Sequence, residues 1–424
     1  MSTQRIEADY LVETAMNPQA AVEMMAGEQS SGTFVPVPGE TPELKARAAA
    51  RVERLEVIGT CDTPSLPGAR RPEGSPIVRI HTTLSWPFTN IGASLPNLVT
   101  TIAGNLFELK PFSGLKILDV RLPAAFGARY PGPKFSVAGT RRLCGVSDRP
   151  IIGTIVKPSV GLSPEGTADL VQTLCEGGID FIKDDELQSD GEGCRFEARA
   201  RAVMEIINAQ ADRSGRKVMF AFNLTGDLDE MRRRHDLVLS LGGTCVMASL
   251  NSVGLVGMIE LARHTQLPLH AHRNGWGYLS RHPLLGWSYI AWQKIWRLAG
   301  ADHLHVNGLS NKFCETDDSV VASARQCLTP LFDSKPCLAV PVFSSGQSAR
   351  QVPGTFAALG SSDLIFAAGG GILAHPDGVA AGVASLQQAW AAAMSGDTLE
   401  SHARGHRELA RALEAYRAWA GDSR

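Results

Sequence analysis

Eight short apolar segments recur between residues 151 and 370, and they constrain the fold more than any other feature of the chain. They are IIGTIVK (151–157), GIDFIK (178–183), KVMFAFNL (217–224), TCVMASL (244–250), LPLHAH (267–272), HLHVNG (303–308), LAVPVFSS (338–345) and LIFAAGG (364–370). Each is too short for a helix, and each is continuously apolar, as in strands that are buried on both faces. Segments of helical periodicity lie between them, such as SPEGTADLVQTLCEGG (163–178). Eight strand–helix repeats predict a (β/α)8 TIM barrel.

A doubly wound open sheet is the alternative to the barrel. It is disfavoured because the repeats are regular and because no G-x-G-x-x-G motif follows the first of these strands. The predicted barrel domain, with helices at its C-terminal end, covers residues 136–424.

The first 135 residues have a different texture and predict an N-terminal α+β domain. Strands are predicted at 10–14, 76–86 and 115–123, helices at 17–27 and 93–107, and a helix running into a strand over 41–59. The segment 127–145, GARYPGPKFSVAGTRRLCG, is rich in glycine and proline and predicts a linker.

Composition excludes several classes of function. The net charge of −2 provides no basic surface for nucleic acid or an anionic membrane, and no apolar stretch is long enough to span a bilayer. The N-terminal residues lack the basic-then-apolar layout of a signal peptide. The 8 cysteines form no CxxC pair, which predicts buried thiols in the reducing cytoplasm instead of disulfides or a zinc site.

Polar and glycine residues stand where the predicted strands end, which is where barrel enzymes carry their chemistry. They are Lys157, Lys183, Asp185, Glu186, Asn223, His272, Arg273, His303, His305, Ser344, Gly346, Gly369 and Gly370. Ser344 and Gly346, together with GGG (369–371), predict a phosphate cradle built from backbone N–H groups, although the glycines alone are compatible with a tight turn. The polar segment 307–318, with Lys312, is either an inert loop or a lid over the substrate.

The run KDDE (183–186) has two interpretations. Runs of charge are usually solvated, so the first is a strand end in water with local pairing. The second is a Mg²⁺ site, because Asp185 and Glu186 offer the hard oxygen ligands that this ion prefers. An ammonium at Lys183 would repel the ion, so the second interpretation requires this lysine to lose its charge or to gain an oxygen.

Several motifs in the same order resemble the large subunit of ribulose-bisphosphate carboxylase/oxygenase (RuBisCO) over nearly the whole chain. They are AGEQSSGTF, AGNLFELK, GTIVKPSVGLSPEG, GGIDFIKDDE, HAHR, HLHVNG, PVFSSG and GGGILAHP. The resemblance implies that CO2 carbamylates Lys183, and that the carbamate joins Asp185 and Glu186 around Mg²⁺. It also implies that Lys157 works in acid–base chemistry beside an enediolate.

The resemblance implies roles for the remaining residues too. His272 would lie near the reacting carbons, and Arg273 and His305 would bind the phosphate end of the substrate. Ser344, Gly346, Gly369 and Gly370 would contact substrate hydroxyls and phosphate, and Lys312 would be the lid lysine. Glu28, Thr33 and Asn105 match residues that complete the site of a neighbouring subunit, which implies a homodimer or an assembly of dimers.

The chain departs from the carboxylating enzymes at Ser159, where they have a second lysine, and at Trp276, where they have another histidine. The lid segment also lacks their glycine-rich form, so the chain resembles the non-carboxylating, RuBisCO-like branch. The first hypothesis is decarboxylation of a small phosphorylated sugar acid, 3-oxo-isoapionate 4-phosphate, to a tetrulose phosphate in apiose and apionate breakdown.

Three alternatives remain open. One is the methionine-salvage enolase that acts on 2,3-diketo-5-methylthiopentyl 1-phosphate, with Trp276 and Phe313 as walls of an apolar pocket. Another is a transcarboxylase/hydrolase acting on the same apionate intermediate. The last is a non-catalytic phosphate-binding protein, which has no physical need for the cluster of Lys157, Lys183 and the two carboxylates.

Overall fold

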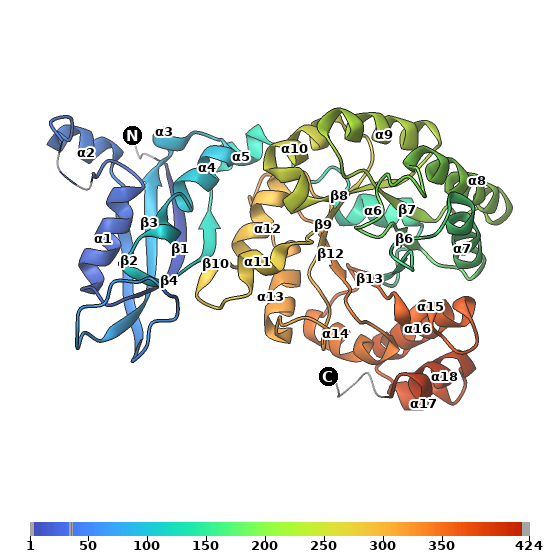
Figure 1. Cartoon of the computed structure of the whole chain (residues 1–424). Helices are drawn as coiled ribbons and strands as arrows, with labels where there is room; N and C mark the ends of the chain where they lie inside the picture. The colour runs from blue at the N-terminus through green and yellow to red at the C-terminus, as the bar shows by residue number, and fades with distance from the viewer. Residues whose placement is uncertain (1–3, 34, 36, 418–424) are drawn as a thin grey trace. The chain divides into compact units, whose positions relative to one another are not determined.

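The computed structural model describes residues 4–33, 35 and 37–417 (Figure 1). The chain forms two compact units. The first contains Met1–Tyr130 and Gly275–Leu298, and the second contains Pro131–Asn274 and Ala299–Arg424. No helix within the described residues combines the length and the apolar character that a membrane span requires.

The first unit is built on a five-stranded sheet in the order β10-β4-β1-β3-β2. Its strands are β1 (Arg5–Thr14), β2 (Arg51–Cys61), β3 (Ile77–Pro87), β4 (Phe112–Arg121) and β10 (Leu285–Trp287). Neighbouring strands are antiparallel, except that β10 runs parallel to β4. Its helices are α1 (Pro18–Glu28), α2 (Pro42–Ala48), α3 (Phe88–Ile91), α4 (Leu95–Ile102), α5 (Ala124–Arg129), α11 (Trp276–Ser280) and α12 (Tyr289–Leu298), with a 3-10 turn η1 (Leu106–Glu108).

Alternation along β1 explains which face of this sheet is covered. Ile6, Ala8, Tyr10 and Val12 are buried at every second position, as expected for a strand with one face on a core. The Tyr10 hydroxyl donates to the Ile102 carbonyl at 2.7 Å and so connects β1 to the end of α4. Each strand and helix predicted for this part of the chain overlaps an observed one, although the helix predicted over 93–107 ends at Ile102.

The second unit is a closed barrel of eight parallel strands in the order β11-β12-β13-β5-β6-β7-β8-β9. They are β5 (Ile151–Ile155), β6 (Phe181–Lys183), β7 (Met219–Asn223), β8 (Cys245–Ser249), β9 (Leu269–His272), β11 (His303–His305), β12 (Val340–Phe343) and β13 (Ile365–Ala367). Each lies within one of the eight apolar segments, so the predicted barrel is confirmed.

Helices are interleaved with these strands and continue to the C-terminal end of the described chain. They are α7 (Pro164–Glu176), α8 (Phe196–Ser214), α9 (Leu228–Ser240), α10 (Leu250–His264), α13 (Asp317–Cys327), α14 (Val352–Leu359), α15 (Gly370–Leu373), α16 (Val379–Ser395), α17 (Leu399–Ala403) and α18 (Arg407–Ala415), with a 3-10 turn η2 (Ala349–Gln351). Local sequence sets their ends. Ser163 caps α7 by accepting from the Gly166 amide, and Gly215 ends α8 in the left-handed conformation.

The segment predicted as a linker contains a helix, α6 (Ser136–Cys144), so the prediction of irregular chain was wrong there. Cys144 packs in one cluster with the first residues of several barrel strands, including Ile151, Phe181 and Met219. Helix α6 therefore closes the amino-terminal end of the barrel. The sequence did not reveal this helix, because it is short and its few apolar residues, Val137, Leu143 and Cys144, stabilise it only by packing on the barrel.

Candidate active site

The run KDDE lies at the carboxyl end of β6, and most of it is buried. Lys183, Asp184 and Asp185 are each at most 1% exposed, while the Glu186 side chain is 31% exposed. The interpretation of this run as a solvated strand end is therefore wrong. Buried charges must be paired, so the partners of these four residues define what the site can do.

Two lysines and two carboxylates form the centre of the cluster. Lys157, just beyond β5, donates from Nζ to Asp185 Oδ2 at 2.6 Å and to Ser159 Oγ at 2.8 Å. Lys183 Nζ donates to the Asp184 carbonyl at 2.8 Å and lies 3.5 Å from Glu186 Oε2. Burial lowers the pKa of the Lys183 ammonium, although the neighbouring carboxylates oppose this.

Glu186 connects this centre to the next polar strand end. His272 Nε2, at the end of β9, lies 3.5 Å from Glu186 Oε2. Burial alone would raise the pKa of Glu186, but the charges of His272 and Lys183 outweigh it and lower this pKa to about 2. Burial and the charge of Lys183 lower the pKa of His272 to about 4. Glu186 is thus an anion over the pH range in which His272 is neutral.

Three further residues, Asp184, Arg199 and Asn223, hold the turn that carries Asp185 and Glu186. Sequence reasoning assigned none of them this role. The fully buried Arg199 of α8 lies 3.2 Å from the Asp184 carboxylate. The Asn223 backbone N–H donates to Asp184 Oδ2 at 2.9 Å. The Asn223 side-chain Nδ2 donates to the carbonyls of Asp185 and Glu186 at 3.3 and 3.2 Å. The turn that carries the two carboxylates is therefore held by hydrogen bonds to its backbone.

The histidine side of the site continues onto β11 and β12. The rings of His272 and His305 meet edge to face, with centroids 4.5 Å apart. His305 Nδ1 lies 3.0 Å from Ser344 Oγ at the end of β12. The structure therefore brings polar groups from the ends of β5, β6, β9, β11 and β12 to one end of the barrel.

The predicted lid and phosphate residues lie at the same end of the barrel. Lys312 Nζ lies 5.3 Å from the ring centre of Phe313, and a Cβ placed on Gly346 would lie 3.9 Å from the Lys312 backbone nitrogen. Arg273 forms an ion pair with Glu315 in the same segment. Ser344, Gly346 and Lys312 are thus neighbours, and Arg273 holds the segment through Glu315.

The predicted phosphate glycines adjoin the loop that follows β12. A Cβ on Gly371 would lie 2.4 Å from the Gln347 carbonyl oxygen, so the two loops are in backbone contact that only glycine allows. Gly369 and Gly370 stand at the start of α15. Their role in binding phosphate stays a prediction.

Glu28, Thr33 and Asn105, predicted to serve a neighbouring subunit, belong to the first unit, and all three are exposed. With its amide oriented to satisfy both bonds, Gln29 donates to the Thr101 carbonyl at 3.0 Å and accepts from the Asn105 amide at 3.3 Å. This brings the end of α1 beside the loop after α4. Their role at a partner's site stays a prediction.

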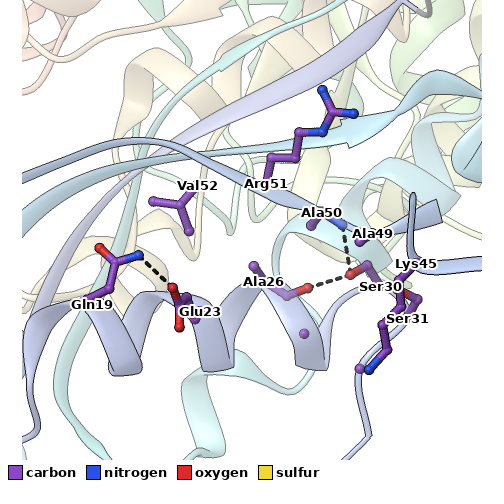
Figure 2. Close-up of a pocket in the computed structure, with 12 residues that line it drawn as sticks. Gln19, Glu23, Ala26, Ser30, Ser31, Lys45, Ala49, Ala50, Arg51 and Val52 are labelled. Atoms are coloured by element: carbon purple, nitrogen blue, oxygen red, sulfur yellow. Dashed lines mark hydrogen bonds between the residues drawn. The ribbon is translucent and has the colours of Figure 1, made fainter. Parts of the chain in front are cut away.

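The first unit contains a cavity of about 540 Å³, and several residues that line it are close to Glu28 and Thr33 in the sequence (Figure 2). It is lined by α1, the residues after it and the start of β2. Figure 2 shows Ser30 Oγ donating to the Ala26 carbonyl at 2.6 Å and accepting from the Ala50 amide at 2.9 Å. None of the barrel residues described above lines this cavity.

Within the described residues, His235, Asp236 and His264 lie close enough together to hold a metal ion. Hydrogen bonds already occupy them. His235 Nε2 accepts from the Gln266 amide at 3.2 Å, and His235 Nδ1 lies 2.9 Å from Asp236 Oδ1, which is also 2.7 Å from His264 Nε2. Both ring nitrogens of His235 are therefore committed, which argues against a metal ion there.

The comparisons with known proteins agree along the whole chain. Residues 4–126 match the family described as ribulose bisphosphate carboxylase large chain, N-terminal domain, and residues 136–419 match its catalytic domain. The chain is 59% identical to a 3-oxo-isoapionate-4-phosphate transcarboxylase/hydrolase of Xanthobacter autotrophicus, over 98% of this chain and 100% of that one. It is 43% identical to a 3-oxo-isoapionate-4-phosphate decarboxylase of Rhizobium rhizogenes, over 97% and 98% of the two chains.

A solved structure also matches over nearly the whole length of both chains. The crystal structure of a rubisco-like protein from Burkholderia fungorum matches with a TM-score of 0.91 at 50% identity, covering 97% of this chain and 99% of that one.

Proposed function

Because the chain belongs to the family of the ribulose bisphosphate carboxylase large chain, we propose that it is an enzyme that breaks the bond to the carboxyl carbon of 3-oxo-isoapionate 4-phosphate. The observation that carries this proposal is the 59% identity, over the full length of the relative, to a protein named for that substrate. The intact cluster of Lys157, Lys183, Asp185 and Glu186 supports a catalytic protein over a non-catalytic one, because burying the charges of Lys183 and Asp185 costs stability.

The donor set at the end of β6 fits Mg²⁺. Asp185 and Glu186 supply carboxylate oxygens, and burial favours the neutral amine of Lys183, the form that CO2 converts to a carbamate with a third oxygen. A Mg²⁺ ion held by these three residues would supply a Lewis acid that stabilises negative charge on the substrate oxygens. Magnesium binding and carbamylation both belong to the proposal.

The residues around this centre suit the loss of CO2, which is the first half of the reaction, and the proton transfer that follows it. When the bond to the carboxyl carbon breaks, its electron pair stays on the substrate carbon and CO2 departs. Lys157 Nζ, oriented by Asp185 and Ser159, holds a proton at the entrance to the site, where its side chain is 45% exposed. Arg273 and the glycines at 369 and 370 are proposed to hold the phosphate. His305, which the resemblance also assigned to the phosphate, has both ring nitrogens engaged by His270 and Ser344.

Two fates of the intermediate are open, and they share this first half. Adding CO2 to another carbon, followed by cleavage with water, is transcarboxylation and hydrolysis. Protonation of the carbon is decarboxylation. We propose the former, because identity to the transcarboxylase/hydrolase is 59% and to the decarboxylase 43%. Decarboxylation, the hypothesis that the sequence put first, remains the second candidate, because Ser159 and Trp276 replace residues that CO2 addition uses in the carboxylases.

Methionine-salvage enolisation has less support. Of the two predicted walls of its apolar pocket, Trp276 is covered by other aromatic rings and Phe313 is exposed. The Trp276 ring packs against Tyr289 and Trp292 at 5.4 and 4.9 Å between centroids, and Phe313 is 55% exposed beside Lys312.

Product analysis distinguishes these reactions. The protein is incubated with Mg²⁺, bicarbonate and 3-oxo-isoapionate 4-phosphate labelled with 13C at the carboxyl group, and 13C NMR follows the label in a sealed tube. We expect the label in a new carboxylate product. Label in dissolved CO2 and bicarbonate, with a tetrulose phosphate, would establish decarboxylation instead. An unconsumed substrate would contradict the proposed function, and the diketo methylthiopentyl phosphate would be tested next.

Metal binding is tested separately from turnover. Calorimetric titration with Mg²⁺ in the presence of CO2 should show binding to the wild type and a loss of at least tenfold in affinity for Lys183→Ala. Unchanged affinity would remove Lys183 from the metal site. His235→Ala is the control, because that histidine lies in the cluster whose hydrogen bonds are already satisfied.

The proposal includes a homodimer or an assembly of dimers, in which Glu28, Thr33 and Asn105 of one subunit complete the partner's site. All three side chains are exposed, so they are accessible to a neighbouring subunit, which supports this part of the proposal. A cytoplasmic location also stays a prediction.

A further inference from the structure

Three histidines form a chain through the interior of the barrel. His270 on β9 and His303 on β11 are direct register partners, and His305 follows two residues later on β11. His270 and His303 have no exposed surface, and His305 is 4% exposed. The proposed reaction gives none of these three rings a bond to the substrate, so their arrangement needs another explanation.

Hydrogen-bonding distances join these rings from one end of the barrel to the other. Thr140 Oγ1 on α6 lies 2.9 Å from His303 Nε2, and His303 Nδ1 lies 3.4 Å from His270 Nδ1. His270 Nε2 lies 2.7 Å from His305 Nε2, and His305 Nδ1 lies 3.0 Å from Ser344 Oγ. The chain therefore connects the helix that closes the barrel to a residue of the candidate active site.

Every ring in this chain is neutral. Burial lowers the pKa of His303 to about 3, and it lowers the pKa of His270 and of His305 well below the usual value. A neutral imidazole has one nitrogen that donates and one that accepts. In each contact between two rings one ring donates and the other accepts, so fixing one ring fixes the tautomers of all three.

Thr140 sets that direction. Its hydroxyl donates to the Ser136 carbonyl at 2.5 Å, and a hydroxyl has one proton, so Thr140 Oγ1 accepts from His303 Nε2–H. The lone pair of His303 is then on Nδ1, where it accepts from His270 Nδ1–H.

The same logic continues to the active site. With its proton on Nδ1, His270 presents the Nε2 lone pair to His305 Nε2–H. The lone pair of His305 is then on Nδ1, and it accepts from the Ser344 hydroxyl. The neighbouring Ser345 hydroxyl donates to Asn307 Oδ1 at 3.0 Å and is therefore not a donor to Ser344.

We propose that Thr140, His303 and His270 are positioning residues that fix His305 as its Nε2–H tautomer and turn the Ser344 hydroxyl proton away from the substrate. Ser344 then offers the substrate only lone pairs. A substrate hydroxyl, which can donate, is accepted there, while a carbonyl or phosphate oxygen is not. The choice of substrate group rests on the proposed function, whereas the tautomers do not.

Neutron diffraction from deuterated crystals of the wild-type protein tests the chain directly and needs no substrate. We expect deuterons on His305 Nε2, His270 Nδ1 and His303 Nε2, and the Ser344 deuteron pointing at His305. A deuteron on His305 Nδ1 would overturn the proposal, because the chain would then run in the opposite direction.

Variants of Thr140 test the consequence. Thr140→Val keeps the shape but leaves His303 Nε2–H without its acceptor, which favours reversal of the chain. We expect 15N NMR of histidine-labelled protein to show His305 shifting toward Nδ1–H, and KM for 3-oxo-isoapionate 4-phosphate to rise about tenfold while kcat changes less. Thr140→Ser keeps the hydroxyl, so its His305 tautomer and its KM should match those of the wild type.

Thr355→Val is the matched control. Thr355 is also fully buried and also donates to the carbonyl four residues earlier, Gln351, but it contacts no histidine of the chain. It should leave the tautomers and KM unchanged. Unchanged tautomers in Thr140→Val would contradict the proposal. If Thr140→Val does not fold, the wild-type neutron map decides alone. If the wild type does not consume the substrate, the proposed function fails while the tautomer measurement still stands.

Discussion

At the scale of single residues, Lys157 is the group best placed to move a proton, because its Nζ is oriented by Asp185 Oδ2 at 2.6 Å and remains partly exposed. Lys157→Met keeps the length of the side chain and removes the proton. We expect kcat to fall by about 10²–10⁴-fold, with a smaller change in KM, in steady-state assays of the labelled substrate.

Ser159→Ala is the comparison for that variant, since it removes the second partner of Lys157 and leaves the amine in place. A loss of less than about tenfold is expected for it. Equal losses in the two variants would mean that the proton on Lys157 is not what the reaction uses.

Arg199 is the residue on which the buried carboxylate of Asp184 depends. Burial raises the pKa of Asp184, and Arg199 opposes this. Arg199→Met leaves that charge without its partner, and we expect the free energy of unfolding in urea to fall by about 3–5 kcal/mol. Arg201→Met, on the same helix but in an exposed pair with Glu197, should change it by less than about 1 kcal/mol. Similar losses in both would mean that the Asp184 pair contributes little.

The sequence placed Lys183, Asp185 and Glu186 at a strand end because an apolar run stops there. It did not reveal that Lys183 and Asp185, together with Asp184 between them, are buried. Their burial depends on Arg199, which is 15 residues from Asp184, and on Asn223, which is 39 residues from it. Such partners are found only once the fold brings α8 and β7 beside β6.

At the scale of elements, Glu13 joins three strands and a loop of the first unit. Its carboxylate, buried on β1, accepts from Ser113 on β4, from Arg79 on β3 and from Ser65 after β2, at 2.8 to 2.9 Å. Burial alone would raise the pKa of Glu13, but these donors outweigh it and lower this pKa from 4.5 to about 2. The charged form is therefore the one that stabilises the sheet.

The sign of the pH dependence follows. A folded-state pKa below the unfolded value stabilises the unit above pH 4.5, and that stability is lost as pH falls from 4.5 toward 2. Glu13→Gln should cost about 2 kcal/mol at pH 7 and flatten this dependence, measured by hydrogen exchange of β1, β3 and β4. Glu7→Gln, in an exposed pair on the same strand, should leave both unchanged. A Glu13→Gln variant as stable as the wild type would contradict the assignment.

The helices and strands differ in how well the sequence predicted them. The barrel strands were predictable because a strand buried on both faces must be continuously apolar. Helix α6 was not, since it is short and its few apolar residues, such as Val137, Leu143 and Cys144, stand among glycine, threonine and two arginines. Strand β10 was not predictable either. It has three residues and exists because Leu285 to Trp287 pair with Leu115 to Ile117 of β4, far away in the sequence.

At the scale of the whole molecule, the proposed dimer places Lys183 and Glu28 of one active site on different chains. Lys183→Ala and Glu28→Gln proteins should each be inactive. Mixing them under subunit exchange should restore about a quarter of wild-type activity, because half of randomly paired dimers are hybrids with one intact site of two. An active Glu28→Gln protein would show that Glu28 is not needed. If both variants are inactive and the mixture, shown by native mass spectrometry to contain hybrids, is inactive as well, each site is built within one chain. Recovery in the hybrid is the result that only a shared site produces.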